Sequence, residues 1–190
     1  YTLSLHDALP ILPCGTDTHT FFELPKDEAR NDLGWEQSGK YVLFAGAFEN
    51  KVKNYALAQK AVTLVNGCQL IELKGYDRVQ VNLLMNACDC LLMTSDKEAS
   101  PMVIKEAMLC GCPIISVDVG DVKDMISGIL GCFIARREPE DIADKLLHIF
   151  ELRERTDGRN RIIQSGLDLS DIARRIQTIY EDVYKIHARK

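Results

Sequence analysis

The sequence predicts an α/β domain in which a doubly wound parallel sheet carries helices on both faces. Two patterns lead to this prediction. Short, continuously apolar runs fit strands, and segments of helical period alternate with them from residue 41 onward. Continuous apolar strands are typical of a parallel sheet that is covered on both sides. A chain of 190 residues, 46% of them hydrophobic and 27% charged, suits one globular domain with its own core.

Five strands and six helices are predicted, and they alternate along the chain until the last two helices. The strands are expected at residues 41–45, 69–73, 90–93, 113–117 and 132–135. The helices are expected at residues 54–65, 79–87, 102–109, 122–126, 138–152 and 170–186. The last helix places Ile172, Ile176 and Ile179 at helical spacing, with Ser170 as its expected N-cap. We expect this apolar stripe to pack mainly on its own domain.

The chain divides into three parts. Residues 1–12 follow neither a helical nor a strand period, so we expect a non-native or disordered tail, resembling translated adapter sequence. The alternative is the final strand or linker of a preceding domain. Residues 13–40 lead into the main domain, which is expected to span residues 41–190.

Charge and cysteine usage narrow the classes of function. A net charge of −5 and a pI near 5.4 argue against nucleic-acid binding. No apolar run is long enough to cross a bilayer, so any membrane contact is expected to be peripheral. The pairs Cys88/Cys90 and Cys110/Cys112 allow a zinc site as an alternative, but structural zinc ligands are usually spaced more widely. Cysteines used as small buried hydrophobes are the preferred interpretation, with no metal bound, and reduced thiols indicate a cytoplasmic protein.

The most informative segment lies between residues 94 and 111, directly after a predicted strand. Open α/β sheets bind ligands beyond the carboxyl ends of their strands, which is where this loop lies. Pro101 is expected as the first helical residue and Ser100 as the cap. The amides of Met102 and Val103 then lack partners within the helix, and such a terminus attracts an anion. The segment therefore predicts a phosphate site.

Two glutamates bracket this helix start. Glu98 precedes the helix, and Glu106 lies within it among apolar neighbours. A lone glutamate on such a helix is more often solvated than functional. The residues themselves therefore leave open whether Glu106 faces solvent or a polar cleft.

The spacing of these residues resembles the signature of glycosyltransferase family 4. Residues 98–101 (EASP), followed by residues 106–108 (EAM), resemble its Glu-Gly-x-Pro…Glu-Ala-Met motif. Residues 13–21 (PCGTDTHTF) are similar to the segment that leads into the donor domain of the family. Residues 111–120 (GCPIISVDVG) resemble its Gly-x-Pro-Val-Val…Asp-x-Gly-Gly run, and residues 42–46 with Lys53 resemble its first strand and phosphate lysine. The resemblance covers nearly everything from residue 13 to the C-terminus.

This resemblance implies the C-terminal, Rossmann-like half of a GT-B fold and a retaining transfer from a nucleotide sugar. Glu98 would contact the donor sugar as the catalytic residue, and Glu106 would bind the ribose hydroxyls. The backbone of the intervening segment would receive sugar hydroxyls and phosphate. Lys53, with Lys51 as a competitor, would hold the diphosphate. The expected donor-binding set is Gly46, Lys53, Ala99, Ser100, Met102, Val103 and Glu106.

The resemblance also implies partners that this chain does not include. The donor would be a UDP- or GDP-sugar, and neither a cofactor nor a metal is expected. An acceptor-binding N-terminal domain would be needed, so this chain is expected to be inactive by itself. The acceptor would be a glycan or a lipid-linked molecule, as in polysaccharide biosynthesis, and the enzyme would act in the cytoplasm or at the inner face of the membrane.

Three residues depart from the family pattern. Ala47 stands where the family often has an arginine, Ala99 replaces a glycine, and Asp121 replaces the second glycine of a pair. These departures leave a non-catalytic nucleotide-binding module as an alternative. A flavodoxin-like signalling domain is a weaker alternative, because residues 44–46 (FAG) provide no acidic phospho-acceptor.

Overall fold

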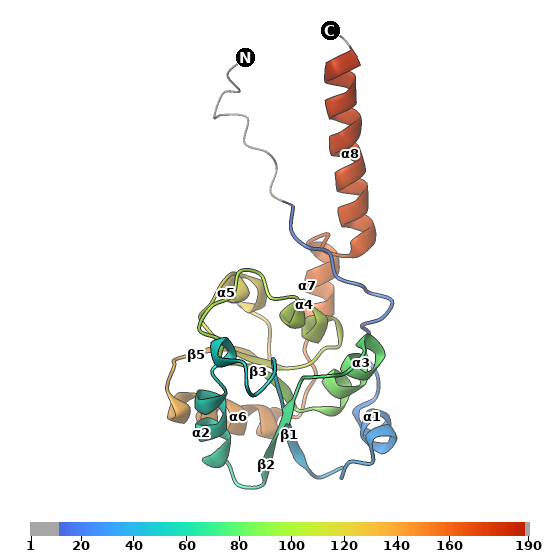
Figure 1. The fold of residues 1–190 in the computed structure, drawn as a ribbon. Coiled ribbons are helices and arrows are strands. Elements are labelled where there is room, and N and C mark those ends of the chain that lie inside the picture. Colours follow the sequence, from blue (N-terminus) through green and yellow to red (C-terminus); the bar gives the residue numbers. More distant parts are fainter. Residues whose placement is uncertain (1–11, 189–190) are drawn as a thin grey trace.

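A computed structural model describes residues 12–188 and shows one parallel sheet between two layers of helices (Figure 1). The predicted fold class is confirmed. The strand order is β2-β1-β3-β4-β5, with all neighbours parallel. The strands are β1 (Lys40–Phe44), β2 (Cys68–Glu72), β3 (Cys90–Met93), β4 (Ile114–Val117) and β5 (Cys132–Ala135).

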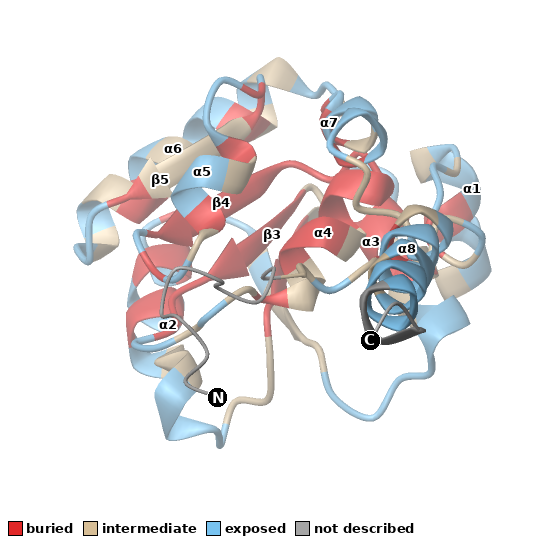
Figure 2. Cartoon of the chain, turned by 90° about the horizontal axis from the view of Figure 1, so that it is seen from above, coloured by how far each residue is buried: buried red, intermediate tan, exposed pale blue. Residues whose placement is uncertain are grey.

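The six predicted helices are present, and their observed ends lie within two residues of the predicted ones. They are α2 (Tyr55–Thr63), α3 (Arg78–Ala87), α4 (Met102–Leu109), α5 (Val122–Ile126), α6 (Pro139–Leu152) and α8 (Leu169–Ala188). Viewed from above the sheet, α2 and α6 cover one face, and α3 and α4 cover the other (Figure 2). This arrangement leaves the strand ends accessible between the two layers.

Three short elements were not predicted. They are α1 (Lys26–Leu33), the 3-10 helix η1 (Lys51–Lys53) and α7 (Gly158–Gln164). The α1 segment is mostly charged and buries only Ala29 and Arg30, so it lacks an apolar period. Arg30 is held instead by polar contacts, donating to the Ala87 carbonyl at 2.9 Å and pairing with Asp89 at 3.0 Å. Polar anchoring of this kind is invisible to a hydrophobic pattern.

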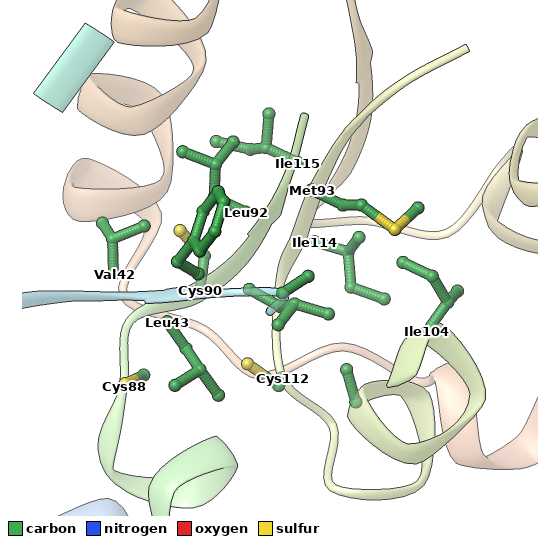
Figure 3. Packing of buried hydrophobic residues seen from close by; sticks show 14 of the residues in the cluster. Val42, Leu43, Cys88, Cys90, Leu92, Met93, Ile104, Cys112, Ile114 and Ile115 are labelled. Carbon is green, nitrogen blue, oxygen red and sulfur yellow. The ribbon is translucent and has the colours of Figure 1, made fainter. Parts of the chain in front are cut away.

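The core is centred on β3, whose four residues are all buried. Figure 3 shows Leu92 and Met93 of this strand packed among side chains of β1, β4 and α4, with Cys88, Cys90 and Cys112 in the same apolar cluster. Burial raises the pKa of the Cys112 thiol to about 11 and raises that of the Cys88 and Cys90 thiols well above the usual value. Within residues 12–188, no group of three or more potential metal ligands is present. The burial of these cysteines in the apolar cluster fits their use as small apolar side chains.

The register of the sheet brings three loops to one edge. Phe44 of β1 lies beside Leu92 of β3, and Leu92 lies beside Ile115 of β4. The segments that follow these strands therefore leave the sheet at the same level. With the order β2-β1-β3-β4-β5, the direction of winding reverses between β1 and β3, which is where open α/β sheets form their ligand crevice.

The last helix corrects two predictions. Ser170 does not cap α8; its amide and that of Asp171 donate to Asp168 Oδ1 at 2.7 and 2.9 Å, so Asp168 caps this turn. The helix also extends away from the sheet instead of packing on it along its length (Figure 1). Ile172 is buried at its start, whereas Ile176 is exposed. An amphipathic period predicts an apolar face, but it does not specify which surface covers that face.

Two further findings concern the ends of the chain and membranes. The predicted tail at residues 1–12 lies, except for Leu12, outside the described residues. Over the described part of the chain, no helix combines the length and apolar character that crossing a bilayer requires.

The buried position of Leu92 leads to a prediction about stability. Leu92→Ala should lower the free energy of unfolding by about 2–5 kcal/mol, because it removes buried methyl groups and leaves a cavity in a packed core. Leu130→Ala is the matched control, since this leucine is 62% exposed. Urea unfolding followed by circular dichroism measures both changes, and equal effects would contradict the assignment of β3 as the core strand.

Candidate functional site

The candidate site lies where the loops after β1, β3 and β4 meet. The β1 loop leads through η1 to α2, the β3 loop leads to α4, and the β4 loop leads to α5. Glu98 and Lys53, predicted from separate parts of the sequence, come together here. Lys53 Nζ lies 2.7 Å from Glu98 Oε1, and both side chains are largely buried. The structure thus brings these two predicted site residues into direct contact.

Gly46 makes room for the Lys53 side chain. Its φ of 155° lies in a region that favours glycine, and a Cβ at this position would lie 2.7 Å from Cγ of Lys53. The glycine after β1 therefore allows the lysine to cross the strand end and reach Glu98. Lys51 is exposed at the start of η1. Of the two lysines, Lys53 is the one directed into the site.

The start of α4 differs from the prediction in one respect. Pro101 occupies the N-cap position instead of the first helical turn, and no side chain of the described residues, Ser100 included, caps the helix. The reason is that Pro101 is extended, with ψ of 119°, so the helix begins one residue later. The amides of Met102 and Val103 are consequently left without a side-chain cap. A terminus of this kind favours an anionic ligand.

Glu106 lies half-buried on α4, beyond the first turn. Burial raises the pKa of its carboxyl group above 4.5, and the positive charge of Arg78 opposes this shift. Arg78, in the first turn of α3, also approaches Asp17 at 3.6 Å. A hydrogen bond from the Thr20 hydroxyl is the main cause that lowers the pKa of Asp17. Glu106 is therefore neither fully solvated nor paired in a short ion pair among the described residues.

The β4 loop supports the segment that follows Glu98. Asp121 donates its amide to the Ala99 carbonyl at 3.0 Å. Gly120 has φ of 56°, and a Cβ there would lie 2.3 Å from the same carbonyl oxygen. Ala99 itself is exposed and has no positive φ, so its methyl group is accommodated without backbone strain. The alanine at this position is therefore compatible with the local geometry.

Sequence reasoning missed several residues that shape this site. Thr94, Asp96 and Asn54 connect the β1 and β3 loops, and Arg137 reaches the β3 loop from the segment after β5. One signal was available for Arg137: it lies two residues beyond a predicted strand, at the edge where the other loops converge. For Arg78, the sequence offers no comparable signal.

Comparison with known proteins now assigns the family. A family model described as "Glycosyl transferases group 1" matches residues 59–152. This stretch runs from α2 to the end of α6 and includes both Glu98 and Glu106. Residues 59–152 are thus similar to the group 1 glycosyl transferases. The resemblance to glycosyltransferase family 4 is thereby confirmed.

One curated protein and several solved structures are similar to this chain. N-acetyl-alpha-D-glucosaminyl L-malate synthase of Bacillus anthracis is 29% identical over 199 aligned positions, which cover 89% of this chain and 52% of that protein. Sucrose-phosphate synthase from Thermosynechococcus elongatus has a TM-score of 0.82 at 19% identity, covering 93% of this chain and 53% of the other. The Anabaena protein HepE, solved in complex with UDP and glucose, has a TM-score of 0.70 at 18% identity, with 90% and 56% covered. The chain therefore spans about half the length of these relatives, and the structural likenesses show that it shares the fold of that half.

The raised pKa of Glu106 generates a prediction about pH and stability. Between pH 4.5 and the raised value, the folded state binds more protons than the unfolded state, so this group makes stability fall as pH rises. Glu106→Gln removes the ionisable group. The variant should therefore melt at a higher temperature than the parent at about pH 7.5, and the difference should shrink at about pH 4.

Glu154→Gln serves as the control for this measurement, since Glu154 is exposed. Calorimetric melts of the three proteins across this pH range provide the test. A constant difference between parent and Glu106→Gln at every pH would show that burial of the charge is not the cause.

The contact between Gly120 and Ala99 generates a second prediction. Gly120→Ala should destabilise the domain more than Gly128→Ala. Both glycines have positive φ, but a Cβ at Gly128 meets nothing within 4 Å. The loss of stability in Gly128→Ala thus measures the cost of placing alanine in this backbone conformation, roughly 1–2 kcal/mol. The additional loss in Gly120→Ala measures the collision with Ala99. Equal losses in chemical denaturation would contradict the close approach of the two loops.

Proposed function

We propose that this domain binds a nucleotide-diphosphate sugar and supplies the donor half of a retaining glycosyltransferase. The observation that carries the proposal is the Lys53–Glu98 ion pair beside the uncapped start of α4, at the switch point of the sheet. A cation, a carboxylate and uncapped helix amides at the same edge of the sheet suit a diphosphate linked to a sugar. UDP is the first ligand to consider, because HepE was solved with UDP and glucose.

Lys53 is proposed to act on the leaving diphosphate. When the bond between sugar and phosphate breaks, negative charge builds up on the diphosphate oxygens. Lys53 and the positive end of the α4 dipole are already in place to stabilise that charge, so little reorganisation is needed. Diphosphate binding would replace Glu98 as the partner of Lys53. The released Glu98 carboxylate would then accept hydrogen bonds from the donor sugar, as the proposed catalytic residue.

Glu106 is proposed to bind the ribose hydroxyls, one turn further along α4. A half-buried carboxylate without a short ion pair is poorly solvated, and two hydroxyl donors would compensate for this. Gly46, Ala99, Ser100, Met102 and Val103 would complete the donor site through their backbone groups. The proposal requires no metal or cofactor, because the leaving charge is assigned to Lys53 and the helix amides.

The second substrate is proposed to bind on a separate domain. The relatives are about twice as long as this chain, which supports an acceptor-binding domain outside it. Transfer requires donor and acceptor in near-attack geometry, and this positioning supplies up to roughly 7–11 kcal/mol. We therefore expect this chain alone to bind the donor without transferring sugar. A glycan or lipid-linked acceptor and a cytoplasmic location, with at most peripheral membrane contact, remain part of the proposal.

Titration calorimetry with UDP-glucose, UDP and uridine tests the donor site, with the GDP series as a second set. Lys53→Gln should weaken UDP binding by about tenfold, which corresponds to loss of roughly 1.4 kcal/mol, and should leave uridine binding unchanged. Lys51→Gln is the matched control, because Lys51 is exposed on the same short helix. Equal losses for UDP and uridine would remove the phosphate role of Lys53.

The same samples separate the enzyme from the alternative function. If the chain binds nucleotides without any preference for their sugar-linked forms, the non-catalytic nucleotide-binding module is favoured. If neither series binds, the donor site itself is rejected. Robust sugar transfer by this chain alone, measured with radiolabelled donors and a panel of acceptors, would contradict the proposed division between two domains.

A further inference from the structure

The segment that carries Glu98 is tied to the segment that carries Lys53 by hydrogen bonds. Thr94 Oγ1 donates to the carbonyls of Lys53 and Asn54 at 2.9 and 3.0 Å. The Asp96 amide donates to the Val52 carbonyl at 2.8 Å. Asn54, in the left-handed conformation with φ of 53°, donates its side-chain amide to Asp96 Oδ1 at 3.0 Å. The separation of Lys53 and Glu98 thus depends on residues 94–96.

Arg137 contacts residues 94–96 from the β5 side of β3, opposite to the β1 side from which Lys53 and Asn54 contact them. It lies in the segment between β5 and α6, two strands away from β3. Its Nη2 donates to the Ser95 carbonyl at 2.9 Å, and its Nη1 pairs with Asp96 Oδ1 at 2.9 Å and approaches the Thr94 carbonyl at 3.4 Å. Thr94 and Ser95 are fully buried, so their carbonyls need donors from the protein.

The planar guanidinium suits this role better than an ammonium group would. Its donors form a rigid fork that reaches acceptors on consecutive residues at the same time. A partly exposed ion pair with Asp96 would contribute little on its own. The additional bonds to buried carbonyls make the contact specific for the shape of the β3 loop. Arg137 makes no hydrogen bond to Lys53 or Glu98 among the described residues, so it acts on them through residues 94–96.

We propose that Arg137 is a positioning residue of the donor site, which fixes the β3 loop so that Lys53 and Glu98 stay in contact beside the start of α4. The expected effects of Arg137 on nucleotide binding rest on the proposed function. Without Arg137, the β3 loop loses its outer support, and Glu98 no longer has a fixed place relative to Lys53. Errors of position on the scale of 1 Å are known to be costly at reacting centres.

Arg136 provides a matched control on the same loop. It is exposed and pairs with Glu138 at 3.0 Å and Asp141 at 3.2 Å, and it makes no bond to residues 94–96. Arg136→Gln therefore removes the same charge from the neighbouring position without touching the β3 loop. The variants to compare are Arg137→Gln, Arg137→Lys and Arg136→Gln, all in the full 190-residue chain.

The first measurement is titration with UDP-glucose, UDP and uridine. Arg137→Gln should weaken UDP-glucose binding by about tenfold and UDP binding less, while uridine binding stays unchanged. Arg137→Lys should resemble Arg137→Gln, because lysine keeps the charge but lacks the fork, and Arg136→Gln should match the parent. A purely structural role predicts equal losses for all three ligands. The proposal would be overturned by equal losses for all three ligands, by an unchanged affinity for UDP-glucose, or by full recovery of binding in Arg137→Lys.

The second measurement does not depend on ligand binding. The coupling between Lys53 and Glu98 is obtained from a double-mutant cycle with Lys53→Gln and Glu98→Gln, using thermal melts. The coupling should disappear in the Arg137→Gln background and persist in the Arg136→Gln background. If Arg137→Gln does not fold, Arg137→Lys replaces it in the cycle. Failure of the parent chain to bind any nucleotide would reject the proposed function, whereas a coupling that survives without Arg137 would reject its positioning role.

Discussion

The pairing of β1 with β3 is the constraint on which the candidate site depends. These strands are adjacent in the sheet but separated in sequence by η1, α2, β2 and α3, and their register sets Phe44 beside Leu92. The Ala45 amide extends the ladder by donating to the Leu92 carbonyl at 3.0 Å. Because both strands end at the same level, residues 45–54 and 94–101 leave the sheet together. The ion pair of Lys53 and Glu98 is a consequence of this register.

The site also shows how buried apolar packing supports a cluster of polar side chains. Beneath the loops, β3 is surrounded by side chains of β1, β4 and α4, so its end has little freedom to move. Above it, the Thr94 hydroxyl and the Asp96 backbone amide donate hydrogen bonds to carbonyls of η1. Gly46 and Gly120 bring neighbouring backbone and side chains closer than any larger residue would allow. The candidate site is therefore held by the packed strand ends and by close contacts between loops.

The strands and the long helices were predictable because their physical cause is local. Continuous apolar runs mark β3 and β4, and the apolar run at residues 102–109 marks α4, although Pro101 is its N-cap and not its first helical residue. The bracketing glutamates were also found, through their spacing. The residues that hold the Glu98 segment in place were not predicted. Asn54, Asp96 and Arg137 lie far apart in the sequence and meet only after the sheet has formed. The direction of α8 was missed for a similar reason: helical period reports an apolar face and not its neighbour.

The positions of the cysteines allow opening of the fold to be followed by the reactivity of the native thiols. Cys14 is exposed, whereas Cys88, Cys90, Cys110 and Cys112 are buried around β3. A thiol reacts with alkylating agents as its thiolate, and burial both raises the pKa of these thiols and blocks access to them. Modification at Cys14 thus proceeds from the native state, while the core thiols become available only when the sheet separates. The slow phase of alkylation, followed by mass spectrometry, therefore measures how often β3 separates from its neighbouring strands. No label has to be introduced for this measurement.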